Sequence, residues 1–582
     1  MAAVRGCLRV AAVVVLCMVP ALWVHGRSLV TFFTSPDDLV YLEQASGMVP
    51  TPFKVFRQLS EVLYFRFMVR IAGLDPLPFH AVTMALHLAN IGLVLRFARA
   101  QGVSGRVAAL AATLFGVFPL FSTVLSSAVG INDELALALA LGALLALRMK
   151  GVAGILLPVT LFALALLSKE SVVFLPLLAF LPGGREPSRP HGARALAVVA
   201  IAALALLPFV RPIRTSEAAI YSVQFGANLF HNLMTYASWA VNVTNPLPDL
   251  VSSYDPHAWH TGIWVALAAL VSLLALGRSE PAVRIGWVWF VLGLLPVLPL
   301  VHLTYRHYLY PAIPGLALAT AGTVMSAIEW LAGRIQRGAP GRVRAPWRIG
   351  AVAAVALALA YTAAADGLVR QRFAARVPGT DLALDPVFRR QEVAAQALAS
   401  FNRQLTPDHS RVGILLPEGT ERVFGARSGR EYARVPRGGQ PYDLLEECLD
   451  HGRAVRLFFP WVDSVAFIAR WTRAYRDFDL FAPSAGGRLS AMGNGPAALN
   501  DVAKWMMENG WYPQAREHLQ GALEAYPTDP GLRLGYGAAL FRTGDRAGAV
   551  AELEQLVREA PGDSAAMAAR AILAKLDSTA RK

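Results

Sequence analysis

The sequence predicts a mainly α-helical protein: a polytopic helical membrane bundle, followed by a soluble α/β region and C-terminal helical repeats. Three observations predict this class. Of the 582 residues, 55% are hydrophobic and only 16% are charged, whereas soluble globular domains have about 45–50% apolar and about 25% charged residues. Apolar segments follow one another through residues 1–366, and a 34-residue period marks residues 499–582. This composition argues against a long water-soluble enzyme, a disordered chain and a chain held together by disulfides.

Eleven apolar segments approach the length of about 20 residues that crosses the hydrocarbon of a bilayer. They are residues 8–25, 79–97, 107–125, 134–147, 152–167, 171–182, 195–210, 259–277, 285–301, 309–330 and 349–366. The pair at 152–182, interrupted by Ser168-Lys169-Glu170, is either two short spans or one long kinked span. The first segment follows two arginines, which is also typical of a cleaved signal peptide. Because no clear small-x-small cleavage site follows it, we interpret it as a retained span.

The loops between these segments differ in charge, which predicts their orientation. With a cytoplasmic N-terminus and eleven spans, the cytoplasmic stretches carry 17 basic residues and three acidic ones. The basic residues are Arg5, Arg9, Arg96, Arg99, Arg106, Arg148, Lys150, Arg185, Arg189, Arg194, Arg278, Arg284, Arg334, Arg337, Arg342, Arg344 and Arg348, and the acidic residues are Glu186, Glu280 and Glu329. The other loops and the C-terminal portion are nearly balanced, so the net charge of +14 gives no support to nucleic-acid binding. We expect a multi-pass protein of the bacterial inner membrane with an extracytoplasmic C-terminal portion.

Residues 367–498, which follow the predicted membrane domain 1–366, have the composition of a soluble domain that mixes strands and helices. Arg411–Leu416 and Val455–Phe459 are apolar runs bounded by turn residues, which predicts buried strands. Residue spacing favours helices over Tyr442–Asp450 and Val465–Tyr475. The segment has no nucleotide-binding glycine fingerprint and no metal-ligand spacing.

Residues 499–582 contain an internal repeat. Gly510 recurs as Gly544, Ala515 as Ala549, Leu519 as Leu553 and Pro527 as Pro561, each after 34 residues. This period resembles tetratricopeptide repeats, in which each unit is a helical hairpin; the alternative is a pair of incidental hairpins. Two units and a last helix bury little surface alone, so we expect them to dock onto the preceding domain and to offer a surface for a protein partner.

Most of the predicted membrane domain is Ala, Leu and Val, and charge inside or beside the bilayer is costly, so the polar residues at its turns are candidates for function. With the predicted orientation they gather at four outer turns. These residues are Asp37 and Asp38, then Asn132, Asp133 and Glu134, then Lys169 and Glu170, and then His302, Arg306 and His307. The first outer loop, residues 26–77, also holds an amphipathic stretch, Lys54–Ile71, that should lie in the membrane interface. The distribution favours a site at the outer membrane surface.

The charged candidates also have structural interpretations. Ser35-Pro36-Asp37-Asp38 before an apolar run is a good start for a capped helix. Lys169 and Glu170 could form a local pair within a short turn. Arg306 could extend its charge toward the lipid headgroups.

The histidines have structural interpretations of their own. His302 and His307 are more typical of interface residues than of metal ligands. His87 and Asn90 lie inside the second predicted span, where polar side chains commonly form hydrogen bonds between helices.

Five motifs in order resemble the GT-C glycosyltransferases, integral membrane enzymes that use polyprenyl-phosphate-linked sugars. The motifs are Asp37-Asp38 after the first span, His87-Leu-Ala-Asn90 in the second, Phe118-Pro-Leu-Phe-Ser122 through Asn132-Asp-Glu134, Leu164-Ala-Leu-Leu-Ser-Lys-Glu-Ser171, and Tyr305-Arg-His-Tyr-Leu-Tyr-Pro311. In layout the chain is similar to the transmembrane and tetratricopeptide repeat-containing mannosyltransferases of the protein O-mannosyltransferase group. The resemblance covers about residues 10–330 and the repeats.

The resemblance implies a substrate class and a division of roles. A sugar, by hexosyl transfer with inversion, would move from a polyprenyl phosphate to a hydroxyl of a protein or glycan acceptor outside the cytoplasm, with the catalytic first loop at 26–77. Asp37 and Asp38 would be catalytic, with Asp37 as the general base because the first acid of the pair has that role in the similar mannosyltransferases. Lys169 and Arg306 would bind the donor phosphate. The supporting polar residues would be Asp133, Glu170, His302 and His307.

No cofactor is expected besides the lipid-linked donor, and the residue spacing gives no support for a divalent metal. Two other functions stay open. A non-catalytic membrane scaffold would recruit envelope proteins through its repeats and would tolerate loss of Asp37, Lys169 and Arg306. A lipid or polysaccharide flippase would need a polar path through the bilayer, and the predicted spans carry almost no charge near their centres.

Overall fold

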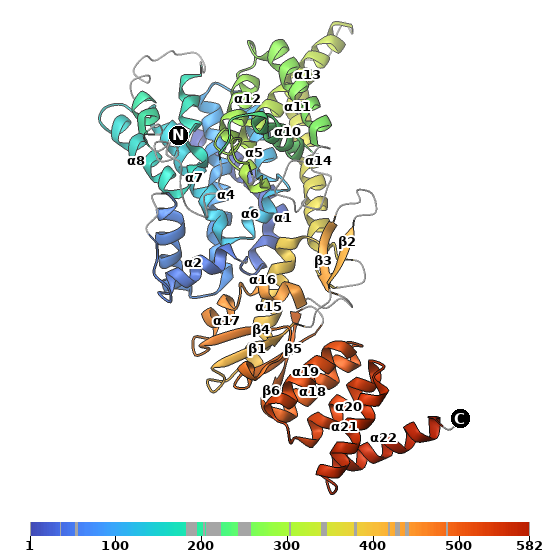
Figure 1. Cartoon of the computed structure of the whole chain (residues 1–582). Helices are drawn as coiled ribbons and strands as arrows, with labels where there is room; N and C mark the ends of the chain where they lie inside the picture. Colours follow the sequence, from blue (N-terminus) through green and yellow to red (C-terminus); the bar gives the residue numbers. More distant parts are fainter. Residues whose placement is uncertain are drawn as a thin grey trace. The chain divides into compact units, whose positions relative to one another are not determined.

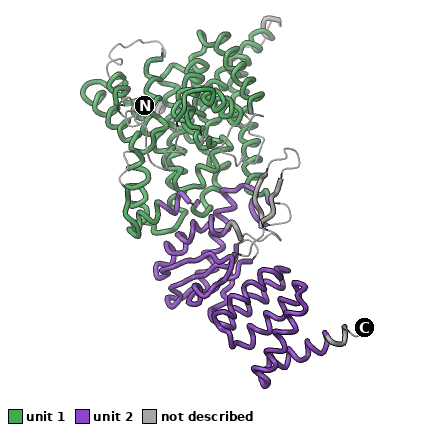
Figure 2. The backbone as a smooth tube through the Cα atoms, viewed as in Figure 1, with its two compact units in different colours: residues 1–33, 41–375 green, residues 34–40, 376–582 purple. Residues whose placement is uncertain are grey.

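The computed structural model places the chain in two compact units, which are coloured separately in Figure 2. It describes residues 2–34, 36–52, 56–181, 195–201, 204, 223–241, 258–301, 304–338, 346–377, 381–416, 420–424, 431–436, 442–484 and 487–580. Unit 1 comprises residues 1–33 and 41–375, and unit 2 comprises residues 34–40 and 376–582. The short segment 34–40 therefore groups with the C-terminal part of the chain rather than with its sequence neighbours.

Unit 1 is built from helices (Figure 1). Its α-helices are α1 (Ala2–His25), α2 (Asp37–Ala45, whose first turn belongs to unit 2), α3 (Tyr64–Ala72), α4 (Pro76–Ala100), α5 (Gly105–Gly116), α6 (Phe121–Leu125), α7 (Ile131–Ala146), α8 (Ala153–Ser168), α10 (Ala227–Val241), α11 (Ala258–Leu276), α12 (Pro281–Leu294), α13 (Ile313–Gly338) and α14 (Pro346–Ala374). Short 3₁₀ or π turns connect them: η1 (Gly26–Val30), η2 (Gln58–Leu63), η3 (Ala128–Gly130), η4 (Glu170–Val172), η5 (Leu175–Phe180) and η7 (Arg306–Leu309).

Six helical segments among the described residues are long and apolar enough to cross a bilayer. They are Ala11–Val30, Pro76–Ala100, Ala128–Ala146, Trp259–Leu276, Ile313–Arg334 and Arg348–Ala374. Shorter apolar helices accompany them at Gly105–Gly116, Ala153–Ser168, Glu170–Phe180 and Pro281–Leu294. Unit 1 is a polytopic helical membrane bundle, as the composition predicted.

Several predicted spans differ from continuous helices, and prolines explain two of the breaks. The segment 107–125 is interrupted between α5 and α6, where Pro119 removes a backbone donor. The segment 285–301 is helical only to Leu294 because Pro296 disfavours helical geometry in the residue before it. The segment 171–182 forms the short turns η4 and η5 rather than an α-helix. Of the segment 195–210, only residues 195–201 and 204 are described.

Helix starts in both units follow one local pattern, an acidic residue before proline. Asp75 precedes α4 and accepts a hydrogen bond from the Leu77 amide at 3.1 Å. Asp385, which precedes Pro386, accepts one from the Val387 amide at 2.9 Å in the same way. Proline is favourable at the first helical position, where its missing N–H costs nothing, and the carboxylate satisfies an amide that the helix leaves free.

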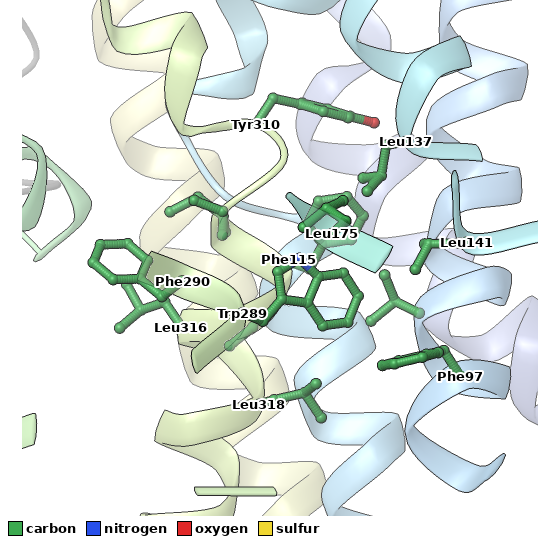
Figure 3. Close-up of a cluster of buried hydrophobic side chains, with 14 of the residues drawn as sticks. Phe97, Phe115, Leu137, Leu141, Leu175, Trp289, Phe290, Tyr310, Leu316 and Leu318 are labelled. Carbon is green, nitrogen blue, oxygen red and sulfur yellow. The ribbon is translucent and has the colours of Figure 1, made fainter. Parts of the chain in front are cut away.

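Large side chains fill the centre of unit 1 (Figure 3). Trp289 of α12 packs edge-to-face on Phe97 of α4 and donates its indole N–H to the Pro311 carbonyl at 2.9 Å. Helices α12 and α13 cross closely, since a Cβ atom added to Gly315 would lie 2.4 Å from the Phe290 amide nitrogen. Small residues at such crossings allow backbones to approach within a membrane bundle.

Unit 2 contains a four-stranded sheet in the order β4-β1-β5-β6. Its strands are β1 (Arg411–Leu415), β4 (Ser464–Ile468), β5 (Asp479–Pro483) and β6 (Leu489–Gly493), and a separate antiparallel pair is formed by β2 (Thr420–Phe424) and β3 (Glu431–Pro436). Strand β1 runs parallel to both neighbours, with Arg411 opposite Ser464 and Val412 opposite Asp479, whereas β6 runs antiparallel to β5. The helices beside the sheet are α15 (Pro386–Gln404), α16 (Tyr442–Cys448), α17 (Arg453–Phe458) and the 3₁₀ turn η9 (Arg473–Tyr475).

Two of the four predicted elements of this domain are right and two are wrong. The strand at β1 and the helix at α16 lie where the sequence predicted them. The expected strand Val455–Phe459 is instead the helix α17, and the expected helix Val465–Tyr475 contains the strand β4. Apolar runs of five residues fit either conformation by periodicity. The β-branched residues of 464–468 pair with β1, a contact more than 50 residues away that local spacing does not report.

The repeat region consists of five helices packed in sequence: α18 (Gly495–Glu508), α19 (Tyr512–Ala525), α20 (Pro530–Arg542), α21 (Arg546–Glu559) and α22 (Ser564–Ala580). It does not fold apart from the sheet. A single buried cluster joins Ile468 and Leu480 of the sheet to Leu499, Leu519 and Leu532 of the repeats. The expected docking of the repeats onto the preceding domain is therefore present within unit 2.

Candidate catalytic site

A buried ion pair links two of the predicted outer turns. Asp133 lies in the first turn of α7, and Lys169 is the residue at which α8 ends and the chain becomes extended. Lys169 Nζ is 2.7 Å from Asp133 Oδ2, and the two side chains are only 6% and 4% exposed. The ammonium group also lies 5.3 Å from the centre of the Tyr308 ring. Burial makes such a pair costly to form and costly to break, which is the pattern of a functional rather than an incidental contact.

A second pair crosses from the first loop to the same turn. Arg57 donates from Nη2 to Glu170 Oε1 at 2.7 Å and from Nε to Oε2 at 3.3 Å, a two-pronged contact that fixes the guanidinium plane. Arg57 also lies 3.4 Å from the buried carboxylate of Glu61, which accepts a hydrogen bond from Asn132 at 3.1 Å. Lys169 and Glu170 thus each form an ion pair with another segment, and the alternative interpretation, a local pair between the two, does not hold.

These contacts join three segments of unit 1, namely the η2 region, the start of α7 and the turn at residues 169–170, into one network, which we call the buried charge network. It consists of Arg57, Glu61, Asn132, Asp133, Lys169 and Glu170. Two cations meet three carboxylates, so the protein itself already balances both positive charges. A phosphate could reach Lys169 only by sharing that cation with Asp133, and phosphate binding by Lys169 stays a prediction.

Arg57 carries a further sign of a specialised position. Its backbone φ is +66°, in the left-handed region that side chains other than glycine rarely adopt. Backbone strain of this kind persists where surrounding contacts over-determine it, and it is concentrated at functional sites. The contacts to Glu61 and Glu170 supply that restraint.

Several buried acceptor oxygens of the same turns have no hydrogen-bond partner within the described part of the chain. They are Asn132 Oδ1, Asp133 Oδ1, both carboxylate oxygens of Glu134, and Ser171 Oγ. A buried oxygen without a donor is unfavourable by about 1–3 kcal/mol. These oxygens are therefore candidates for hydrogen bonds from a ligand or from water.

Arg306, the other predicted cation, lies in a turn that packs against α10. Arg306 lies in η7 with its guanidinium 5.3 Å from the centre of the Trp239 ring of α10. Two turns earlier on α10, the buried Asn232 donates to the carbonyls of Leu298 and Leu300, each at 2.8 Å. These two bonds hold residues 298–300, which precede the Arg306 turn in the sequence. Asn232 was not among the residues predicted for the site.

The predicted histidines have different outcomes. His302 lies outside the described residues. His307 is stacked on Tyr305 at 5.3 Å between ring centres and packs edge-on against Tyr308. Burial, together with the positive charges of Lys169 and Arg57, holds the pKa of His307 well below its usual value, so the ring is neutral at physiological pH.

Helix α4 contributes the interhelical hydrogen bonds that the sequence predicted for it. His87 bonds through Nδ1 to the Tyr310 hydroxyl and through Nε2 to the Gly116 carbonyl, both at 2.9 Å. Asn90 donates to the Glu134 carbonyl at 2.9 Å and to the same Tyr310 hydroxyl at 3.2 Å. This prediction is confirmed, and the bonds fix the start of α7 and the end of the Arg306 turn relative to α4.

The acidic pair of the first loop lies at the start of α2, in the segment that groups with unit 2. Asp38 is fully buried, and its Oδ2 accepts a hydrogen bond from the Thr34 amide at 2.7 Å. The Thr34 hydroxyl is itself bonded to Gln391 of α15 at 2.7 Å. Asp37, one residue earlier, is exposed. The two acids therefore differ: Asp38 is tied to the helix start, and Asp37 is open to solvent.

Two further features of this region differ from the expectation or were missed. The Lys54–Ile71 stretch was expected to lie in the interface as an amphipathic segment, and α3 does expose Phe67 and Ile71. Its Arg57 and Glu61, however, turn into the network; their spacing of four residues in an apolar stretch was the only local signal. Among the described residues, no three His, Cys, Asp or Glu side chains gather as a metal site.

Comparison with known proteins identifies one part of the chain. A family model described as "Tetratricopeptide repeat" matches residues 506–576, which correspond to the helices from α18 to α22. These residues are tetratricopeptide repeats. The incidental-hairpin alternative is thus excluded, and the tetratricopeptide repeats end the chain's second unit.

No curated protein matches the chain. Among solved structures, the chain is similar to one described as ArnT from Cupriavidus metallidurans bound to undecaprenyl phosphate. The two share 13% identity and a TM-score of 0.33 over 82% of this chain and 93% of that chain.

Proposed function

We propose that the protein is a membrane glycosyltransferase that moves a sugar from a polyprenyl phosphate to an acceptor hydroxyl on the extracytoplasmic side. The observation that carries the proposal is the buried charge network. Charged side chains from three segments meet at the helix ends of an apolar bundle, where burying charge is costly. The order of the motifs that supply these residues, which resembles GT-C glycosyltransferases, supports the same function.

The proposed reaction breaks one bond and forms one. The acceptor oxygen attacks the anomeric carbon of the donor sugar, and the bond from that carbon to the phosphate oxygen breaks, releasing the polyprenyl phosphate. The hydroxyl proton passes to a carboxylate, for which Asp37 is the candidate because its side chain is exposed at the start of α2. The carboxylate of Asp38 is already engaged by the Thr34 amide.

Cations and acceptor oxygens would bind the two ends of the donor. Arg306 and Lys169 are the candidates for stabilising the negative charge that develops on the leaving phosphate. The unpartnered oxygens of Asn132 and Asp133 would accept hydrogen bonds from sugar hydroxyls. Inversion of configuration is expected from the family resemblance alone.

The proposed orientation places the N-terminus in the cytoplasm of a bacterial cell and unit 2 outside it. The 17-to-3 excess of basic over acidic residues in alternate loops supports this arrangement. A reporter fused after residue 370 should be active only outside the cytoplasm. A fusion active only in the cytoplasm would contradict the orientation and move the proposed site to the other side.

The tetratricopeptide repeats support a second, compatible role in recognising a protein partner or acceptor. Repeats of this kind present extended surfaces. Their removal at residue 499 would expose Leu415 and Ile468, which they cover, so truncation is a poor test. Substitution of exposed repeat residues such as Lys504 should change acceptor choice. The rate at which the sugar is transferred to a small acceptor should stay unchanged.

The experiment that tests the function compares envelope glycans and glycoproteins from cells with and without the protein by mass spectrometry. We expect loss of one hexose-containing species, restored by the parent chain and not by Lys169→Met. Arg278→Gln, a charge removal on the exposed loop between α11 and α12, is the matched control and should restore it. An unchanged set of glycans would contradict the proposal and favour the scaffold or flippase alternative.

A further inference from the structure

A second group of charged residues lies in unit 1, formed by the first and last predicted spans. Asp366 of α14 accepts contacts from three groups at once. Arg370 Nη2 lies 2.6 Å from one carboxylate oxygen and Arg27 Nη1 lies 3.4 Å from the other, while the Trp23 indole donates at 3.2 Å. The Arg370 guanidinium also lies 5.8 Å from the centre of the Trp23 ring. We call this set the Asp366 cluster.

The Asp366 cluster differs from an ordinary ion pair in its charge and exposure. Two guanidinium groups face one carboxylate, so the cluster keeps a net positive charge. The side chains of Arg27 and Arg370 are 42% and 50% exposed, whereas that of Asp366 is 10% exposed. Trp23 is 65% exposed. The cations and the indole are therefore presented outward, with the carboxylate behind them.

Helix geometry places this cluster at one membrane surface. Asp366 follows Arg348 by 18 residues of helix, which is about 27 Å at 1.5 Å per residue. Arg27 follows Arg9 by the same number of residues. A hydrocarbon core is about 30 Å thick. Arg348 and Arg9 therefore lie near one surface of the bilayer when the Asp366 cluster lies near the other. Tryptophan and arginine are typical of this depth.

Both helices also expose apolar side chains that lead up to the cluster. On α14 these are Val352, Val355 and Leu359, and on α1 they are Leu16 and Val19. Their spacing of three, four or seven residues puts each set on the same face of its helix as Asp366 or Trp23. The buried contacts of Val24 with Val369 hold the two helices together beneath the cluster.

We propose that the Asp366 cluster binds the headgroup of an anionic phospholipid, with the acyl chains along the exposed faces of α1 and α14. The phosphate would accept hydrogen bonds from Arg27 and Arg370, whose planar groups suit phosphate oxygens. The net positive charge of the cluster favours an anionic lipid over a zwitterionic one, as basic pockets between spans do for anionic headgroups. This site is separate from the proposed catalytic residues and does not depend on the enzymatic function.

The test measures lipid retention by the purified full chain in detergent, using native mass spectrometry with added phosphatidylglycerol or phosphatidylcholine. We expect the parent protein to retain phosphatidylglycerol preferentially. Arg27→Gln/Arg370→Gln should lower its apparent affinity by roughly fivefold per arginine. Arg27→Lys/Arg370→Lys keeps the charge and should retain part of the binding, and Arg278→Gln, a control at another exposed loop, should change nothing.

Asp366→Asn separates lipid binding from a simple helix clamp. It removes the competing carboxylate, so a lipid site should bind phosphatidylglycerol more tightly, whereas a clamp would only loosen the two helices. Equal retention of both lipids by the parent, unchanged retention in the double glutamine variant, or weaker retention in Asp366→Asn would each overturn the proposal. If the double glutamine variant does not fold, the lysine and asparagine variants still decide it.

Discussion

Two groups of charged residues in unit 1 use the same chemistry under opposite exposure to solvent. In the buried charge network, Lys169 and Asp133 are almost entirely enclosed. In the Asp366 cluster, both arginines face outward. Contact distance alone does not indicate the role of an ion pair, since the Lys169–Asp133 and Arg370–Asp366 distances are nearly equal. Enclosure makes the first pair rigid and costly to disrupt, and exposure leaves the second available to a ligand.

The largest effect should come from breaking the enclosed pair on one side. Lys169→Met leaves the Asp133 carboxylate charged and unpaired, which should lower the free energy of unfolding by about 3–5 kcal/mol. Thermal denaturation in detergent would measure the loss. Adding Asp133→Asn should restore most of the stability, although not the activity. A loss below about 1 kcal/mol in the single variant would contradict the importance we give to enclosure.

Unit 2 contains a buried histidine, His518, that is neutral. His518 of α19 bonds through Nε2 to the Leu499 carbonyl at 2.9 Å, and burial lowers its pKa to about 4. The unfolded chain, with a histidine pKa near 6.5, binds this proton more readily, so stability should fall as the pH drops from about 6.5 to about 4, by up to about 3 kcal/mol.

Hydrogen exchange over residues 495–525 of the full chain at pH 7 and pH 4.5 would measure this effect. Exchange should be faster at the lower pH in the parent protein. His518→Gln has no titrating ring and should show a smaller difference between the two conditions. An equal difference in both proteins would exclude His518 as the cause.

An intermediate effect should follow from removing an enclosed amide. Asn232→Ala removes the donor that the Leu298 and Leu300 carbonyls share, which should cost about 2 kcal/mol. Hydrogen exchange should rise in the turn that leads to Arg306. Asn228→Ala, one turn earlier and partly exposed, is the matched control and should have a smaller effect. Equal effects would indicate that enclosure does not determine the contribution of these amides.

The smallest effect should come from the exposed group. Arg370→Gln removes a cation that is half exposed, and exposed ion pairs contribute about 0–1 kcal/mol to stability. Thermal denaturation without added lipid should place this variant within about 1 kcal/mol of the parent. A loss as large as that of Lys169→Met would erase the contrast between the two groups.

Features that depend on nearby residues could be predicted from the sequence. Features that depend on contacts between residues far apart in the chain could not. The 34-residue period and the positions of the polar turns between the helices could be predicted because they depend on residue type and spacing. The partner of Glu170 was not, because Arg57 lies 113 residues earlier and its helix-like spacing suggested an interfacial position. Val465–Ile468 became a strand for the same reason: its parallel pairing with β1 outweighs the local pattern.

Asp37 and Asp38 have different environments, as the sequence predicted. Adjacent residues on a helix point about 100° apart, so the sequence required different roles for Asp37 and Asp38. Burial of Asp38 against the Thr34 amide and exposure of Asp37 are consistent with that division. The assignment of Asp37 as the base stays a prediction, because it rests on the family resemblance and on this exposure.

The most direct test of the central claim is sugar transfer by the purified full chain carrying Asp37→Asn or Asp38→Asn, with a polyprenyl-phosphate sugar as donor. Asp37→Asn keeps the shape of the side chain and removes the proton acceptor, so turnover should fall roughly 10²–10⁴-fold, the usual effect of losing a general base. Asp38→Asn keeps an oxygen for the Thr34 amide and should have a smaller effect on turnover. Transfer at the parent rate by Asp37→Asn would contradict the account.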